Sequence, residues 1–175
     1  MPPKVIVRSS GADPAALRNR SARIVHALTD LGTTHVVGVP DNITQYLYEM
    51  FDSDHRVKVV PVCREGETWA IASGLWVGGK QPVVVIQNTG FSESGDSLRG
   101  TAIEMGVPLI ALMDYRGYRS LGTLNVDSAA RCFELILKAW GLCYQFLEDG
   151  KEAQILKTAL DKAFELNRPV AVLIR

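Results

Sequence analysis

The chain has 175 residues, 47% of them hydrophobic, which fits one domain with its own core. Its 19 basic and 19 acidic residues cancel, which argues against a nucleic-acid binder that works by neutralising phosphates. A surface with so little net charge does little to oppose self-association, so we expect oligomers. The apolar runs are too short to cross a bilayer and the N-terminus lacks the apolar core of a signal peptide, so the prediction is a cytoplasmic protein.

The three cysteines, Cys63, Cys132 and Cys143, are an odd number and show no metal-ligand spacing. This usage is typical of a reducing compartment and predicts free thiols. We expect these thiols to be mostly buried.

The first half of the chain alternates helices and strands. Residues 1–12 contain Pro, Ser and Gly and are expected to be flexible, with Val5-Ile6-Val7 as a stretch that fits a sheet edge. Asp13 and Pro14 fit a helix N-cap and the first helical position, and Gly32 ends that helix. The elements that follow are strand 35–39, helix 43–51, strand 57–62, a small-residue helix within 62–80 and the buried strand 82–86.

The second half continues the alternation. Its expected elements are a polar loop at 87–96, helix 97–105, strand 107–113, an irregular stretch at 114–125, helix 128–140, strand 142–147, helix 151–167 and strand 169–174. Strands that alternate with helices predict an α/β fold with an open parallel sheet of about six strands and helices on both faces. We therefore expect a single domain over residues 13–175.

Polar residues follow each of the first four predicted strands. Asp41 comes after the first strand, Glu65 after the second, Gln87-Asn88 after the third, and Asp114 to Arg116 after the fourth. Because parallel strands all finish at one edge of a sheet, these residues are expected to gather where open sheets bind ligands. Every doubly wound fold has polar loops at that edge, so this geometry raises the odds of a site only modestly.

Four motifs carry a family resemblance. The string Arg64-Glu65-Gly66-Glu67, followed by Ala70-Ile71-Ala72-Ser73-Gly74 and Gly79-Lys80, resembles the pyrimidine-binding domain of thiamine diphosphate enzymes. The patterns most like it are those of sulfopyruvate decarboxylase alpha subunits and phosphonopyruvate decarboxylases. The supporting motifs, in the family's order, are Gly38-Val39-Pro40-Asp41-Asn42, Gln87-Asn88-Thr89-Gly90 and Tyr115-Arg116-Gly117. The resemblance runs from about Ile24 to Arg175.

The resemblance gives Glu65 a catalytic role. The aligned glutamate of the family hydrogen-bonds N1′ of the cofactor's aminopyrimidine, which favours the imino tautomer that activates the thiazolium C2. Such a carboxyl works best when buried, and Val62, Trp69 and Ala72 are its expected neighbours. The alternative is a carboxylate that favours the helix dipole, a role that suits Glu67 better because Glu67 lies in the first turn and is expected to face solvent.

The resemblance also assigns the other motifs. Asp41 is expected near the reacting substrate, where it assists protonation after carbon dioxide leaves, although a turn or N-cap role is its plain alternative. Asn42, at a position where the family often has serine, is expected to bind the substrate. Gln87, Asn88, Thr89 and Gly90 are expected to contact the pyrimidine or a partner chain, with Gly90 allowing close backbone approach to the ligand.

Arg116 is the expected substrate-anion clamp. A guanidinium is a fork that suits a sulfonate, a phosphonate or a carboxylate. Arg116 and Arg119 both lie in a long irregular stretch, where the ordinary role of an arginine is a solvated charge. The family pattern favours Arg116 of the two.

The family's active sites need a second domain for the cofactor's diphosphate and Mg²⁺. The Gly-Asp-Gly motif that holds them is absent, since Gly95-Asp96-Ser97 lacks the second glycine and a preceding strand. We therefore assign no metal ligand to this chain, and from its length we expect no second domain of similar size. The resemblance implies a separate diphosphate-binding beta subunit, which supplies most of the contacts to the Mg²⁺ and the diphosphate.

Three classes of function compete. The first is an alpha-type subunit of a thiamine diphosphate-dependent 2-oxoacid decarboxylase, with 3-sulfopyruvate ahead of phosphonopyruvate and a carboligase third. The second is a non-catalytic regulatory domain that kept the fold, which the retention of Glu65 disfavours. The third is a flavodoxin-like nucleotide module, but the first strand-to-helix turn lacks a glycine-rich phosphate loop.

Overall fold

Six strands form one sheet in the computed structural model, which describes residues 13–175; the stretch Val5-Ile6-Val7 lies outside the described residues. Every neighbouring pair is parallel, and the spatial order is β2-β1-β3-β4-β6-β5. The strands are β1 (His35–Gly38), β2 (Lys58–Pro61), β3 (Pro82–Gln87), β4 (Ile110–Asp114), β5 (Cys143–Phe146) and β6 (Val170–Ile174). The predicted α/β fold is confirmed.

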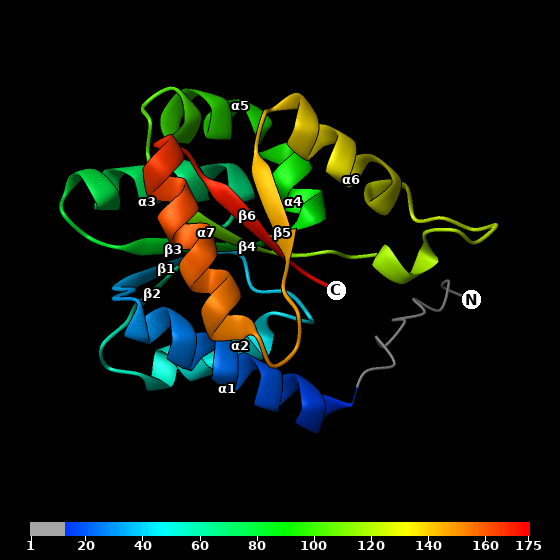
Figure 1. Ribbon diagram of the computed structural model, residues 1–175, viewed down its shortest axis with the longest axis horizontal. Coiled ribbons are helices and arrows are strands. Elements are labelled where there is room, and N and C mark those ends of the chain that lie inside the picture. The colour runs from blue at the N-terminus through cyan, green and yellow to red at the C-terminus, as the bar shows by residue number, and fades with distance from the viewer. Residues whose placement is uncertain (1–12) are drawn as a thin grey trace, which may run out of the picture.

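Helices cover both faces of this sheet (Figure 1). One face is covered by α1 (Pro14–Asp30), α2 (Gln45–Ser53) and α7 (Glu152–Leu166). The other face is covered by α3 (Glu65–Val77), α4 (Asn88–Glu93), the short α5 (Gly95–Ser97), the π-helical turn η1 (Leu98–Ile103) and α6 (Ser128–Ala139). A 3₁₀ turn, η2 (Tyr118–Ser120), lies in the loop between β4 and α6.

The two hydrophobic cores follow from the alternation of side chains along each strand. Val83, Val85, Ile110 and Leu112 belong to the core under α1, α2 and α7. Their neighbours along the strands, Val84, Ile86, Ala111 and Met113, belong to the core under α3, α4 and α6. Since both faces are buried, these strands are apolar without interruption, which is why the sequence reads as continuous apolar runs.

Local signals set several of the element ends. The Asp13 side chain accepts a hydrogen bond from the Ala15 backbone N–H at 3.0 Å, and Pro14 takes the first helical position of α1, as predicted. Gly32, with φ of 84°, follows the end of that helix. Strand β4 begins at Ile110 rather than at the expected Val107, because Pro108 has no N–H to donate to a neighbouring strand.

The predicted polar loop at 87–96 is wrong, because most of this segment forms α4 and α5. Phe91 is the reason: its ring is fully buried and packs edge-on against Trp69 at 6.5 Å and Phe133 at 5.6 Å between centroids. One apolar residue among serines and glycines gives no helical period, so the sequence pattern missed a helix that tertiary packing stabilises. The helix predicted at 97–105 is present as the end of α5 followed by η1.

The expected burial of the cysteine thiols is also wrong. Cys63, Cys132 and Cys143 are free but all three are exposed. Cys63 lies in the turn between β2 and α3, Cys132 on the outer side of α6, and Cys143 at the start of the edge strand β5. Composition predicts how often cysteines are buried, whereas these positions depend on which face of each element meets solvent.

Candidate active site at the carboxyl edge of the sheet

The predicted site residues lie at the point where the strand order reverses. From β1 the chain moves outward to β2 and then crosses back to β3, so β1 and β3 form the switch point of the sheet. Asp41 follows β1, Gln87 ends β3 and is paired in register with Asp114 at the end of β4, and Glu65 begins α3 after β2. Open α/β sheets bind ligands in the crevice at this position.

Glu65 is the first residue of α3 and is half-buried. The role of helix cap falls to Glu67, whose Oε2 accepts hydrogen bonds from the backbone N–H groups of Cys63 at 3.2 Å and Arg64 at 3.4 Å. Glu67 is exposed, as expected. Because Glu67 accepts the capping hydrogen bonds, the Glu65 carboxyl is not needed to cap α3.

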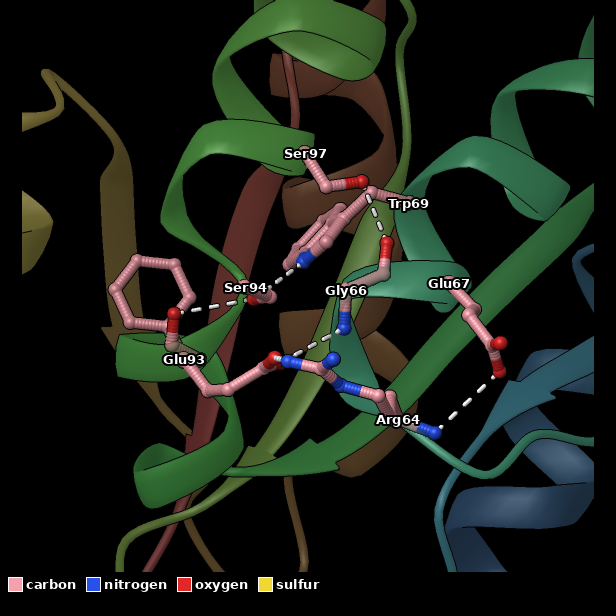
Figure 2. Close-up of polar contacts among 8 residues, drawn as sticks. Arg64, Gly66, Glu67, Trp69, Glu93, Ser94 and Ser97 are labelled. Carbon is pink, nitrogen blue, oxygen red and sulfur yellow. Dashed lines mark hydrogen bonds and ion pairs between the residues drawn. The ribbon is translucent and has the colours of Figure 1, made fainter.

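Helix α4 and the segment after it fix the start of α3, as Figure 2 shows. The Glu93 carboxylate pairs with the Arg64 guanidinium and accepts a hydrogen bond from the Gly66 backbone N–H at 3.2 Å. Ser97 donates its hydroxyl to the Gly66 carbonyl, and the Trp69 indole N–H donates to Ser94 Oγ at 2.8 Å. These contacts hold the residues on both sides of Glu65 against α4.

Gly90 gives the Glu65 side chain its place. A Cβ added to Gly90 would overlap Glu65 Cγ, Cδ and Oε1, all of them closer than the 3.0 Å limit that real Cβ contacts respect. Gly90 was expected to let a ligand approach the backbone, but in the structure its bare backbone is in contact with the Glu65 side chain. Two distant motifs of the sequence, Arg64 to Glu67 and Gln87 to Gly90, therefore build one site.

Asp41 combines a turn role with an unpartnered oxygen. Its Oδ1 accepts hydrogen bonds from the backbone N–H groups of Ile43 at 2.7 Å and Thr44 at 2.9 Å, so the plain alternative is realised. Its Oδ2 is buried and has no hydrogen-bond partner among the described residues. Asn42 is exposed, and its carbonyl accepts a hydrogen bond from the Gln45 side chain. A buried oxygen without a partner is a place where a ligand donor fits.

The Gln87 to Thr89 side chains bond to one another and to the next strand end. Thr89 donates to Gln87 Oε1 at 2.8 Å, and the Gln87 amide nitrogen faces Asp114 Oδ2 at 3.4 Å. The Asn88 amide nitrogen donates to the Arg116 carbonyl at 3.0 Å. Asn88 Oδ1 is buried and has no partner among the described residues, so of these three side chains Asn88 retains a free acceptor.

Asp114 is a functional candidate that sequence reasoning left without a role. It is 5% exposed, and burial, followed by the charge of Asp41, raises the pKa of its carboxyl from 3.8 to about 7. The hydrogen bond from Gln87 and the charge of Arg116 act in the opposite direction. The signal available in the sequence was an acidic residue at the end of a buried apolar strand.

Arg116 lies in the loop beyond β4 and is exposed. Its Nε lies 3.5 Å from Asp127 Oδ2, and Gly117, with φ of 80°, packs so closely on Asp127 that a Cβ there would overlap it. Arg119 is also exposed, in η2. Arg116 therefore lies beyond the carboxyl end of β4 with a carboxylate as its partner in the structure, and its role as a clamp stays a prediction.

The site suits a flat, nitrogen-rich ring better than a metal ion. Within residues 13–175, no group of three or more His, Cys, Asp or Glu side chains is arranged to hold a metal. What the site offers is the Glu65 carboxyl seated on Gly90, together with the unpartnered buried oxygens Asp41 Oδ2 and Asn88 Oδ1. These acceptors match the ring and amino N–H groups of an aminopyrimidine, so the residues present fit that part of thiamine diphosphate.

An open parallel sheet with acceptors at its switch point defines the class of cofactor-binding α/β domains. Within this class the sequence is specific: residues 18–130 match the family model for the thiamine pyrophosphate enzyme, N-terminal TPP binding domain, and the chain belongs to this family. In the part of the chain that the structure describes, no helix has both the length and the apolarity needed to cross a membrane.

Several characterised proteins are similar to the chain. It is 32% identical over 97 residues to a phosphonopyruvate decarboxylase of Streptomyces viridochromogenes, a match over 55% of this chain and 24% of that protein. It is 22% identical over 157 residues to the sulfopyruvate decarboxylase subunit alpha of Methanococcus maripaludis, over 89% of this chain and 94% of that subunit. The match thus spans about a quarter of the phosphonopyruvate decarboxylase but nearly all of the alpha subunit.

A solved structure supports the fold. The Rhodococcus jostii RHA1 thiamine diphosphate-dependent 4-hydroxybenzoylformate decarboxylase aligns with a TM-score of 0.66 at 17% identity, over 88% of this chain and 29% of that one. At this identity the alignment shows a shared fold and carries no information on the substrate.

Proposed function

We propose that this chain is the alpha-type subunit of a thiamine diphosphate-dependent 2-oxoacid decarboxylase. The observation that carries the proposal is the seating of Glu65, at the start of α3, on the bare backbone of Gly90 at the carboxyl edge of the sheet. A carboxyl at this place suits the hydrogen bond to N1′ of the aminopyrimidine that the family resemblance implies. The retained carboxylate also argues against the non-catalytic alternative.

The substrate proposed first is 3-sulfopyruvate, which is converted to the aldehyde without oxidation. Relatives named as sulfopyruvate decarboxylase alpha subunits match this chain over most of their length, which supports this choice. Phosphonopyruvate is the second candidate, because proteins of that name match at 32% identity. Both acids carry an anion beyond the carboxylate. In this proposal Arg116 binds that second anion after it separates from Asp127. A carboligase that uses another 2-oxoacid ranks third.

Each residue then has a defined task when the cofactor binds. Bound thiamine diphosphate supplies the electron sink for the pair of electrons that loss of carbon dioxide leaves behind. Glu65 would hold a proton shared with N1′, and the unpartnered Asn88 Oδ1 would accept a hydrogen bond from the ring's amino group. Asp41, whose Oδ2 has no partner among the described residues, would lie near the substrate. Helix α4 packs Gly90 against the Glu65 side chain and so covers one side of it.

A separate beta subunit supplies the rest of the active site in this proposal. The name "subunit alpha" of the archaeal relatives supports a partner. We propose that the partner carries the Gly-Asp-Gly motif, holds the diphosphate and Mg²⁺, and that paired copies of each subunit form a closed hetero-oligomer. The neighbouring reading frame is the first place to look for such a chain.

The experiment compares the purified chain alone with the chain mixed with the candidate partner. Decarboxylation of sulfopyruvate, phosphonopyruvate and pyruvate is measured with thiamine diphosphate and Mg²⁺ present. We expect turnover only in the mixture and weak cofactor binding by the chain alone, because most of the cofactor's charge lies on the diphosphate. Substantial activity or tight, metal-dependent cofactor binding by the chain alone would refute the split site, and a mixture inactive on every 2-oxoacid would refute decarboxylation.

A further inference from the structure

The first turn of α3 lacks a hydrogen-bond acceptor at its N-cap position. The N-cap residue is Arg64, whose guanidinium carries donors but no acceptor. The backbone N–H groups of a first helical turn have no partner inside the helix and need acceptors from elsewhere. Glu67 accepts from the N–H groups of Cys63 and Arg64, which both precede the first helical residue, Glu65. The turn that carries Glu65 therefore depends on an acceptor from outside α3.

That acceptor is Glu93, the last residue of α4 (Figure 2). Its Oε2 accepts a hydrogen bond from the Gly66 backbone N–H at 3.2 Å, and its Oε1 pairs with the Arg64 guanidinium. The bond from Arg64 and, to a smaller extent, that from Gly66 hold the pKa of the Glu93 carboxyl below its ordinary value of 4.5, although desolvation acts in the other direction. Glu93 is therefore an ionised acceptor at neutral pH, and its charge suits the positive end of α3.

Gly66 is bound through both of its backbone groups. The Ser97 hydroxyl donates to its carbonyl oxygen, while Glu93 accepts from its N–H. Because glycine has more backbone freedom than any other residue, the peptide that follows Glu65 needs this restriction from its neighbours. The glycine does not reflect a lack of room, since a Cβ on Gly66 would lie 3.6 Å from Glu93 Oε2 and 3.9 Å from Ser97 Cβ, both ordinary contacts.

Helix α4 also carries the other groups of this part of the site. Gly90, which lies a helical turn before Glu93, is in contact with the Glu65 side chain. Asn88, with its unpartnered Oδ1, is the first residue of the same helix. A shift of α3 against α4 would therefore change the distance between the two groups, Glu65 and Asn88, that the proposed function assigns to the aminopyrimidine.

We propose that Glu93 is a positioning residue, which sets the place of the Glu65 carboxyl by binding the Gly66 backbone N–H. This inference rests on the proposed function, because the place of Glu65 matters for catalysis only if Glu65 contacts the cofactor. Glu93 acts through the backbone of α3 and takes no part in the chemistry itself. A second carboxylate, on a neighbouring helix, thus supplies the acceptor that the N-cap residue lacks.

The first test measures the Gly66 amide in the chain alone. The full chain is labelled with ¹⁵N-glycine, the Gly66 signal is identified by its loss in Gly66→Ala, and exchange of this amide with solvent is followed by NMR. Glu93→Ala should raise the exchange rate by about tenfold, whereas Glu93→Gln, which retains an acceptor oxygen, should raise it by less than about threefold. The control Glu104→Ala removes another exposed carboxylate, which pairs with Arg99, and should leave the rate unchanged. A rate that Glu93→Ala does not raise would overturn the inference.

The second test uses the enzyme assembled with partner and cofactor. Glu93→Ala should lower kcat by about tenfold while KM for the 2-oxoacid changes by less than about twofold, because Glu65 is displaced and the contacts to the substrate are kept. Glu93→Gln should retain most of the activity. In a Glu65→Gln background, Glu93→Ala should cause no further loss of kcat. An equal tenfold loss in that background would show a structural role that is independent of Glu65 and would overturn the inference.

The third test separates restriction of the backbone from an effect of charge. Alanine fits at position 66 and reduces the freedom of the first turn, so Gly66→Ala combined with Glu93→Ala should have a kcat about threefold above that of Glu93→Ala alone. A double variant no more active than Glu93→Ala, or a Glu93→Ala enzyme with the wild-type kcat, would overturn the inference alone. A wild type inactive on all 2-oxoacids would instead refute the proposed function, and the amide exchange would still decide whether Glu93 holds Gly66.

Discussion

Replacing Gly90 with alanine tests the contact that joins the two central motifs. Gly90 lies within α4, where alanine is the better helix former by roughly 0.5–1 kcal/mol. The new Cβ, however, would overlap three atoms of Glu65, because an ordinary van der Waals contact of a Cβ begins at 3.4 Å. Glu65 must therefore retreat by roughly 1 Å or more, since packed atoms do not tolerate closer approach.

The size of the effect follows from this displacement. A reacting group misplaced by about 1 Å costs about 10²-fold in rate, so kcat of the assembled enzyme should fall by that amount in Gly90→Ala. The melting temperature should change by only a few degrees, about what 1 kcal/mol produces, because helix propensity offsets part of the strain. The loss is therefore expected in catalysis rather than in folding.

The assay measures kcat, KM and the thermal midpoint of Gly90→Ala beside Gly100→Ala. Gly100 is a matched control, because a Cβ there meets nothing within 4 Å. If Gly90 acts through Glu65, then adding Gly90→Ala to Glu65→Gln should cause no further loss. Wild-type kcat in Gly90→Ala, or additive losses in the double variant, would refute the reasoning.

Two further predictions follow from the same site. Glu65→Gln keeps the size of the side chain but cannot share a proton, so it should lower kcat of the assembled enzyme by at least about 10²-fold with the fold intact. The control Glu67→Gln should have a mild effect, because an amide oxygen can still cap α3. Near-normal turnover by Glu65→Gln would end the assignment. Arg116→Ala should raise KM for sulfopyruvate and phosphonopyruvate by about tenfold or more, which corresponds to the loss of one charge-assisted hydrogen bond. The increase in KM for pyruvate should be far smaller, and Arg119→Ala serves as the control. Equal losses on all three acids would show that Arg116 is no specific clamp.

Much of the site could be located from strand ends alone. Asp41, Gln87 and Asp114 lie at one edge because parallel strands finish together, and the apolar runs that identify the strands are long and uninterrupted. The seat of Glu65 could not be found in this way. Gly90 and Glu65 meet across two helices, and α4 itself depends on the burial of Phe91, which no local period reveals.

The sequence by itself determined the alternation of strands and helices, the caps at Asp13 and Gly32, and the family motif around Glu65, because each depends on residues that are near one another in the chain. Only the tertiary structure decided that Gly90 receives Glu65 and that Asp114 is buried beside Gln87. Burial and the approach of distant charges set the pKa of a carboxyl, and neither is a property of its neighbours in sequence.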